Sequence, residues 1–327
     1  MRINDTTYNP TNLPIDPHLL GAATLAFFLL RVVPGDICEV RFGGVEGGVY
    51  DKEAVDICRE KNHLNKPITV QFERFIVGIF TLEFGESMWS RTPISEGLAQ
   101  RFPLSIQLTI MAMTVSVLIG IPLGVVAALY QDTWVDYTAR SFSIIGMAVP
   151  SFWFGMMIIV GLLLSTHQFF DQPWMPPLQY VSFFEDPLTN ISQMFWPALA
   201  VGYRFSAALT RWTRSALLEV LHEDYVRTAQ AKGLFQTIVI RRHALKNAML
   251  PVVTVLGMEF AALLSGLVVV EQVFNLNGIG KWFVLAVNDH DFTVTQTLVL
   301  LFAAIFAITN FIVDHIYAWL DPRIHYN

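Results

Sequence analysis

The sequence predicts an all-α integral membrane protein with about six transmembrane helices and a small extracytoplasmic domain between the first and second helices. Composition is the first reason, because 54% of the 327 residues are hydrophobic and only 15% are charged. In soluble domains about a quarter of all residues are charged. Long apolar segments are the second reason, and an uneven distribution of lysine and arginine between them is the third. Lipid is therefore the expected solvent for most of the chain.

Five apolar segments after residue 100 are long enough to cross a bilayer, which takes about 20 residues in a helix. They are Leu104–Leu129, Ser141–Thr166, Ser192–Thr210, Asn247–Val270 and Phe292–Val313. Only two of them contain a charged side chain, since Arg204 lies in the third and Glu259 in the fourth.

The sixth candidate span, Leu19–Val33, is short and is closed by Arg31 and the helix-stopping pair Pro34-Gly35. The stretch before it, "MRINDTTYNPTNLPIDPH", is polar and rich in proline, so it does not extend the helix backwards. It also lacks the basic region and cleavage site of a secretory signal. Residues 1–33 are thus an N-terminal segment with a short first span. Two interpretations stay open: a tilted helix in a thinned bilayer, or an atypical start of the chain.

Basic residues set the predicted orientation. Eight of the 21 lysines and arginines fall between Arg204 and Lys246, whereas residues 167–193 have none. The positive-inside rule places the basic loop, residues 211–248, in the cytoplasm with both chain termini. Residues 34–103 also hold eight lysines and arginines, but long segments translocate largely regardless of charge. We therefore predict an extracytoplasmic domain over residues 34–103 and a core of about five spans over residues 104–327.

Both cysteines of the chain, Cys38 and Cys58, fall in this predicted extracytoplasmic domain. A disulfide is compatible with the oxidising side of a membrane. Spacing in the sequence does not establish the geometry of a bridge, so two free thiols remain an equal alternative.

Motifs for catalysis or metal binding fail on their spacing. The stretch "GIGK" at residues 278–281 is similar to a phosphate-binding loop, but that loop requires glycine where Asn275 stands and Ser or Thr where Trp282 stands. The histidines, including His222 and His243, are scattered, and no Cys/His cluster has metal-ligand spacing. The sequence predicts no catalytic residue, no metal site and no cofactor bound by this chain. The basic residues do not form the stripe with interleaved aromatics that marks a nucleic-acid partner.

The cytoplasmic loop contains the stretch "EDYVRTAQAKGL", Glu223–Leu234. Residues 216–231 suit a helix, and Gly233 suits the left-handed position that ends one. Val226, Ala229 and Gly233 share one face of this helix. Because the residues on this face are small, another backbone could approach it closely. Two interpretations have equal weight on composition: a helix that enters a groove of another protein, or an amphipathic linker on the membrane surface.

The same stretch is similar to the cytoplasmic signature loop of ABC importer permeases, the inner-membrane subunits of binding-protein-dependent transport systems. Other stretches resemble the dipeptide, oligopeptide and nickel branch of these permeases, in the same order along the chain. They are "LLRVVPGD", "NKPITVQFERF", "LEFGESMWSRTPISEGLAQRFPLSIQLT", "IGIPLGVVAAL", "AVPSFWFGM", "LTRWTRSALLEVLHEDYVRTAQAKGL", "RHALKNAMLPVVTVLG", "VVVEQVFNLNGIGKW" and "DPRIHY". One departure follows Gly233, because the general signature expects its proline where Lys246 stands and this chain has Leu250-Pro251.

The resemblance implies a subunit of a larger machine in the bacterial or archaeal plasma (inner) membrane. A second, non-identical permease would complete the pathway, two ATPase subunits would bind ATP and Mg, and an extracytoplasmic binding protein would deliver the cargo. Peptides are the first expectation for that cargo, among dipeptides, oligopeptides, nickel complexes and other small solutes. The loop helix would couple ATP hydrolysis to transport through Glu223, Tyr225, Val226, Arg227, Thr228, Ala229, Ala231, Lys232 and Gly233, with the small face inside the ATPase groove.

Two other functions remain as alternatives. An ion-coupled secondary transporter would need intramembrane coupling residues and an internal repeat, whereas Glu259 is the one clear intramembrane acid. An integral membrane enzyme would need ionisable residues clustered at one depth. Because an acid in mid-membrane costs about 3 kcal/mol, we expect Glu259 to face a pathway or a protein partner, and not lipid.

Overall fold

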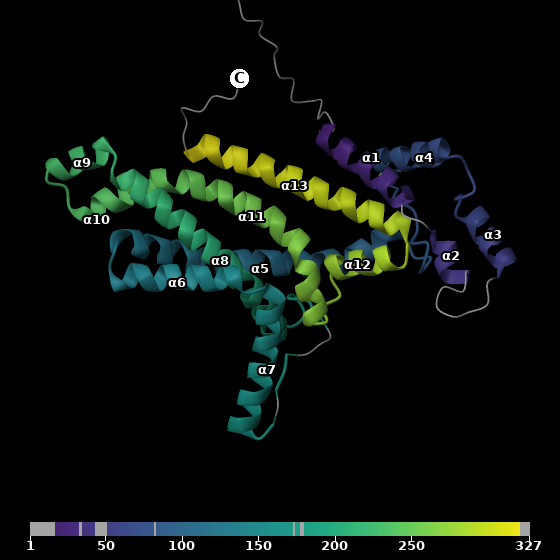
Figure 1. Ribbon diagram of the computed structural model, residues 1–327, viewed down its shortest axis with the longest axis horizontal. Helices are drawn as coiled ribbons and strands as arrows, with labels where there is room; N and C mark the ends of the chain where they lie inside the picture. Colours follow the sequence, from purple (N-terminus) through teal and green to yellow (C-terminus); the bar gives the residue numbers. More distant parts are fainter. Residues whose placement is uncertain are drawn as a thin grey trace, which may run out of the picture.

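A computed structural model describes residues 17–32, 35–42, 51–81, 83–172, 174–176 and 180–320. Over these ranges the chain is helical and has no β-sheet, with a single isolated bridge between Glu86 and Pro93. The helices form an elongated bundle with one arm standing away from it (Figure 1). The expectations for residues 1–16 and for the C-terminal stretch "DPRIHY" lie outside the described residues.

The N-terminal third forms four helices at one end of the bundle (Figure 1): α1 (Pro17–Val32), α2 (Ile37–Phe42), α3 (Lys52–Lys61) and α4 (Ile68–Thr81). The side chain of Asp51 starts α3 by accepting a hydrogen bond from the backbone N–H of Ala54. None of the side chains of α4 is buried. The segment predicted to be an extracytoplasmic domain is thus made of small helices that share little apolar core with the bundle.

Two long helices form the centre of the bundle: α5 (Ile94–Leu129) and α8 (Pro187–Leu221). Helix α5 begins ten residues before the span predicted from Leu104, because Pro103 is tolerated inside it. Gly120 and Gly124 have the spacing of small residues at helix–helix interfaces. A Cβ at Gly120 would lie 2.8 Å from the Cβ of Leu209, and one at Gly124 would lie 2.6 Å from the Cβ of Thr213. The two glycines therefore permit the close approach of α8.

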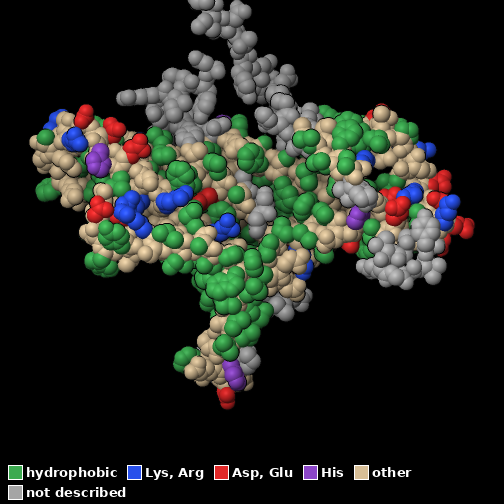
Figure 2. All heavy atoms as spheres, viewed as in Figure 1, with side chains coloured by type: hydrophobic (Ala, Val, Ile, Leu, Met, Phe, Trp, Pro, Cys, Tyr) green, Lys and Arg blue, Asp and Glu red, His purple; other side chains and the backbone are tan. Residues whose placement is uncertain are grey.

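The span predicted as one helix over Ser141–Thr166 is two helices, α6 (Trp134–Ala148) and α7 (Ser151–Phe170). Pro150 is the physical reason, because proline disfavours the helical conformation in the residue before it. Val149 accordingly has extended dihedrals, with φ −82° and ψ 123°. Helix α7 is the arm that leaves the bundle, and its surface is mostly hydrophobic (Figures 1 and 2).

The C-terminal half contains α9 (Asp224–Ala231), α10 (Gln236–Ile238), a π-helical turn over Val239–Ala244, α11 (Leu245–Val273), α12 (Ile279–Asn288) and α13 (Phe292–Leu320). The continuous helix expected over residues 216–231 is wrong, because α8 ends at Leu221 and a turn precedes α9. Three described helical segments are long and apolar enough to cross a membrane: Ile94–Leu129, Ser151–Phe169 and Phe292–Val313. The total of about six spans stays a prediction.

Candidate functional site

Helix α9 lies at the end of the bundle opposite the N-terminal helices, beside the C-terminal end of α8 (Figure 1). The chain turns because Glu223 has extended dihedrals, with φ −68° and ψ 144°. At its other end α9 stops at Ala231, and Gly233 follows two residues later with a φ of +77°. The left-handed conformation predicted for this glycine is therefore confirmed.

The inner face of α9 packs on the permease itself. Val226 is fully buried and Ala229 is 7% exposed, and both contact Val239 of the π-helical turn. The sequence-based expectation that Val226 and Ala229 face outward is wrong. They share a face as predicted, but α9 folds back on Val239 and on the end of α8, so that this small face is covered within the chain.

One side chain links α9 to the next long helix. The hydroxyl of Tyr225 accepts a hydrogen bond of 2.8 Å from the Nδ2 of Asn247, which lies in the first turn of α11. Tyr225 remains 40% exposed. Helix α9 is therefore fixed by apolar packing on one side and by a polar contact to α11 on another.

The outer face of α9 is polar and open to solvent. Its exposed residues are Glu223, Asp224, Arg227, Thr228, Gln230, Ala231 and Lys232. Arg227 and Asp224 form an ion pair at 3.9 Å, but both side chains are mostly exposed and such a pair contributes little. Charged side chains gather at this end of the molecule (Figure 2).

Three apolar residues that the sequence analysis missed lie directly after α9. Leu234 is 41% exposed, Phe235 79% and Ile238 43%. An exposed phenylalanine beside a charged helix is unfavourable in water, and such patches mark interaction sites. The signal in the sequence was the apolar pair that follows Gly233 inside a loop predicted to face water.

Glu259, the predicted intramembrane acid, lies in the middle of α11. Its side chain is 8% exposed, and its Oε2 has no hydrogen-bond partner among the described residues. The neighbouring Phe260 packs against the core formed by α5, α12 and α13. Glu259 is thus inside this chain, and by helix rise it lies about 18 Å along α11 from Asn247, the residue that Tyr225 of α9 contacts.

The motif "GIGK" takes part in a closed joint between α5, α11 and α12. Glu271 is fully buried; its Oε1 accepts a hydrogen bond of 2.6 Å from the hydroxyl of Ser105, and its Oε2 accepts one of 2.8 Å from the backbone N–H of Lys281. The same hydroxyl of Ser105 accepts a bond from the N–H of Ile279. A helix N-terminus favours an anion. Here the chain supplies its own carboxylate at the place where a phosphate would bind.

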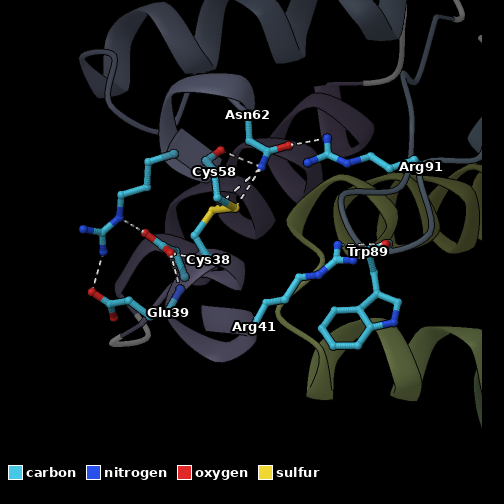
Figure 3. Close-up of a disulfide and its surroundings, with 9 residues drawn as sticks. Cys38, Glu39, Arg41, Cys58, Asn62, Trp89 and Arg91 are labelled. Atoms are coloured by element: carbon cyan, nitrogen blue, oxygen red, sulfur yellow. Dashed lines mark hydrogen bonds and ion pairs between the residues drawn. A yellow bond between two sulfur atoms is a disulfide. The ribbon is translucent and has the colours of Figure 1, made fainter. Parts of the chain in front are cut away.

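The two cysteines form a disulfide that joins α2 to α3 (Figure 3), with an S–S distance of 2.07 Å. Beside the bridge, the Nδ2 of Asn62 lies 3.4 Å from the Sγ of Cys58. The Oδ1 of Asn62 accepts a hydrogen bond of 2.9 Å from Arg91, which lies in the loop before α5. The bridge therefore ties the small helices together, and Asn62 connects them to the start of the bundle.

Comparison with protein families identifies the chain. Residues 120–326 match the family model described as binding-protein-dependent transport system inner membrane component. The chain belongs to this family. It is 36% identical to the glutathione transport system permease protein GsiC of Salmonella paratyphi A over 314 residues, which cover 96% of this chain and 97% of that protein. A Brucella suis biovar 1 protein, named as a permease of a peptide transport system, is 34% identical over 311 residues, 95% of this chain and 96% of its own.

Solved structures share the fold at low sequence identity. A chain of the MetNI methionine ABC transporter in an inward-facing conformation has a TM-score of 0.53 and 16% identity, covering 70% of this chain and 98% of that one. A chain of an amino acid ABC transporter has a TM-score of 0.52 and 14% identity, covering 68% and 94%. The chain is the permease subunit of an ABC importer. This result replaces the alternative interpretation of the chain as an ion-coupled secondary transporter.

Proposed function

We propose that the outer face of α9 and the apolar residues after it form the surface that a separate ATPase subunit binds. One observation carries this proposal: the chain leaves Phe235 79% exposed beside a charged helix whose inner face is already packed. Arg227 and Lys232 would then fix the register of the contact through charge, while Leu234 and Phe235 supply its apolar area.

Support also comes from the way α9 is attached. Val226 and Ala229 connect it to Val239, and Tyr225 connects it to Asn247 at the start of α11. A displacement of α9 by the ATPase would therefore move two long helices. To shift a gate from 1:99 to 99:1 takes about 5.5 kcal/mol of differential binding, which is the work this attachment would transmit.

The remaining assignments follow from that role. A second, non-identical permease would complete the pathway, and an extracytoplasmic binding protein would deliver the cargo. ATP and Mg would bind to two ATPase subunits, so this chain would catalyse no reaction. Residues 34–103 and their disulfide would lie outside the cytoplasm, while residues 211–248 and both termini would lie inside it, as the distribution of basic residues favours.

The proposed cargo is a small peptide. Relatives that cover nearly the whole chain are named for glutathione and for peptide transport. Glu259 is the candidate for a pathway contact with a cationic group, because its Oε2 is buried without a partner in the described chain. Glu259→Gln should lower uptake while the complex stays assembled, and normal uptake would exclude this role.

A substitution that introduces a charge tests the proposed docking surface. Phe235→Asp places a carboxylate on the proposed surface and leaves the inner face of α9 intact. We expect the variant to reach the membrane in normal amount, to lose most of the co-purifying ATPase and to lose uptake. Phe184→Asp is the matched control, since Phe184 is 94% exposed between α7 and α8, far along the chain from α9. If both variants retain the ATPase equally, the proposal is wrong.

A further inference from the structure

A cavity of about 400 Å³ lies between α1, α4, the loop over residues 83–91 and the first turns of α13. Its volume falls in the range of small-molecule sites. Polar and charged side chains from all four segments line it, among them Gln71, Gln296, Thr293 and Thr297. It lies apart from α9 and from Glu259, so its role is separate from the coupling and pathway proposals.

The arginines that line this cavity form no ion pair with an acidic residue in the described part of the chain. Arg31 donates to the Oε1 of Gln71 and to the carbonyl of Phe27, and Arg91 donates to Asn62. These acceptors are neutral. Arg74 also lines the cavity, and the ion pairs found within the described part of the chain involve other arginines. Three arginines thus line one cavity without an ion pair among the described residues.

Unpaired groups of other kinds line the same cavity. Glu83 and Glu86 contribute two carboxylates, and neither takes part in an ion pair within the described residues. Gln296 is 5% exposed, and its Nε2 has no hydrogen-bond partner there. A buried donor without an acceptor is unfavourable unless a ligand supplies one. The cavity therefore combines arginines and an amide donor, which suit an anionic group, with two glutamates, which suit a cationic group. A zwitterionic ligand carries both kinds of group.

Two of the helices that form this cavity, α1 and α4, also carry exposed apolar side chains. On α4, Val77 is 53% exposed and Phe80 is 59% exposed. On α1, Leu29 is 63% exposed and Val32 is 79% exposed. The cavity also reaches the first turns of the candidate span Phe292–Val313. A polar pocket at the end of a candidate span, formed by helices that also expose aliphatic and aromatic side chains, suits the headgroup level of a bilayer.

We propose that this cavity binds the headgroup of a phospholipid that carries a primary amine, with its acyl chains along the exposed faces of α1 and α4. Guanidinium groups match the geometry of a phosphate, so Arg31, Arg74 and Arg91 hold the phosphate oxygens. An ammonium group has three donors, which Glu83 and Glu86 accept. The exposed apolar side chains of α1 and α4 favour a lipid over a soluble zwitterion, because a soluble ligand gains nothing from exposed Val77 and Phe80.

The experiment is native mass spectrometry of the complete importer after extraction from nanodiscs. The nanodiscs contain equal parts of ethanolamine, choline and glycerol phospholipids with identical acyl chains. We expect preferential retention of the ethanolamine lipid. Arg74→Gln should lower retention of all three lipids by about tenfold. The double variant Glu83→Gln with Glu86→Gln should keep lipid but lose the preference for ethanolamine over choline, whose headgroup has no N–H donor.

A matched control lies on the same helix. Glu73 is exposed on α4 and is not among the residues that line this cavity, so Glu73→Gln should leave the lipid pattern unchanged. Retained lipids in the ratio of the nanodisc, or retention that Arg74→Gln leaves unchanged, would overturn the proposal. Free phosphoethanolamine that binds while no lipid is retained would also overturn it, because the site would then serve a soluble ligand.

Discussion

Gly278 and Gly233 each adjoin a short helix, but the structure requires glycine at the two positions for different reasons. At Gly278, before α12, an added Cβ would lie 2.1 Å from the Oε1 of Glu271 and 2.5 Å from the Oγ of Ser105. At Gly233, after α9, an added Cβ would meet no atom within 4 Å, and only the φ of +77° favours glycine. The first glycine is required by lack of space inside a closed joint. The second is required by backbone conformation at a surface that remains open.

The largest expected effect breaks the closed joint. Gly278→Ala forces a methyl group against a buried carboxylate whose position is fixed by Ser105 and by the backbone of Lys281. Overpacking alone costs about 1–3 kcal/mol, and displacement of the carboxylate would also break the buried hydrogen bonds of Glu271, so that we expect the total cost to exceed about 3 kcal/mol. We expect little folded variant in the membrane by fluorescence-detected size exclusion.

Gly233→Ala is the comparison for that variant. It meets the left-handed penalty of about 1 kcal/mol and no steric contact, so it should accumulate normally. Equal amounts of the two variants in the folded state would show that the distinction between closed joint and open surface is not real.

The next effect concerns a second closed joint, which lies between α6 and α8. Asp136 of α6 is fully buried and accepts two hydrogen bonds from Arg214 of α8, at 2.7 and 2.8 Å, as well as bonds from Arg140. The bonds from Arg214, with those from Arg140, hold the pKa of Asp136 well below its usual value. Asp136→Asn leaves Arg214 without its counter-charge and should lower the stability at pH 7 by about 3 kcal/mol.

The pH dependence of that difference has a defined sign. Because the folded pKa of Asp136 is lowered, its carboxylate stabilises the fold above the unfolded value of about 4. That contribution declines as the pH falls from about 4 toward the folded pKa. Thermal unfolding in detergent should therefore give a constant gap between parent and variant from about pH 8 to pH 5, and a smaller gap below pH 4. A gap that widens on acidification would contradict the assignment.

Sequence patterns predicted the local features and missed their spatial context. The left-handed Gly233 was predictable, because glycine after a helix has few other reasons to stand there. The shared face of Val226 and Ala229 was predictable from spacing. Its direction was not, because the partner Val239 lies in a π-helical turn that hydropathy does not reveal.

Long-range contacts explain the other differences. The motif at residues 278–281 was interpreted only as a failed phosphate loop, since Ser105 comes from 166 residues before Glu271 in the sequence. Hydropathy merged α6 and α7 because the apolar run continues through Pro150, whose effect on the preceding backbone is local. The family, in contrast, was predictable from ordered motifs, which need no contact to be recognised.

Cysteine protection on α9 tests the central claim most directly. Both native cysteines are in a disulfide, so a single introduced thiol can be followed without background. Ala231→Cys places a thiol on the exposed face, and Ala229→Cys places one on the buried face. In the isolated permease, the thiol at position 231 should be alkylated rapidly and that at position 229 slowly.

Addition of the ATPase subunits should then slow alkylation at position 231 by about tenfold or more, through occlusion of the open surface. An exposed thiol in the predicted extracytoplasmic domain, Asn65→Cys, should keep its rate in the same complex. If position 231 is alkylated at the same rate with and without the ATPase, the open surface of α9 is not where the ATPase binds.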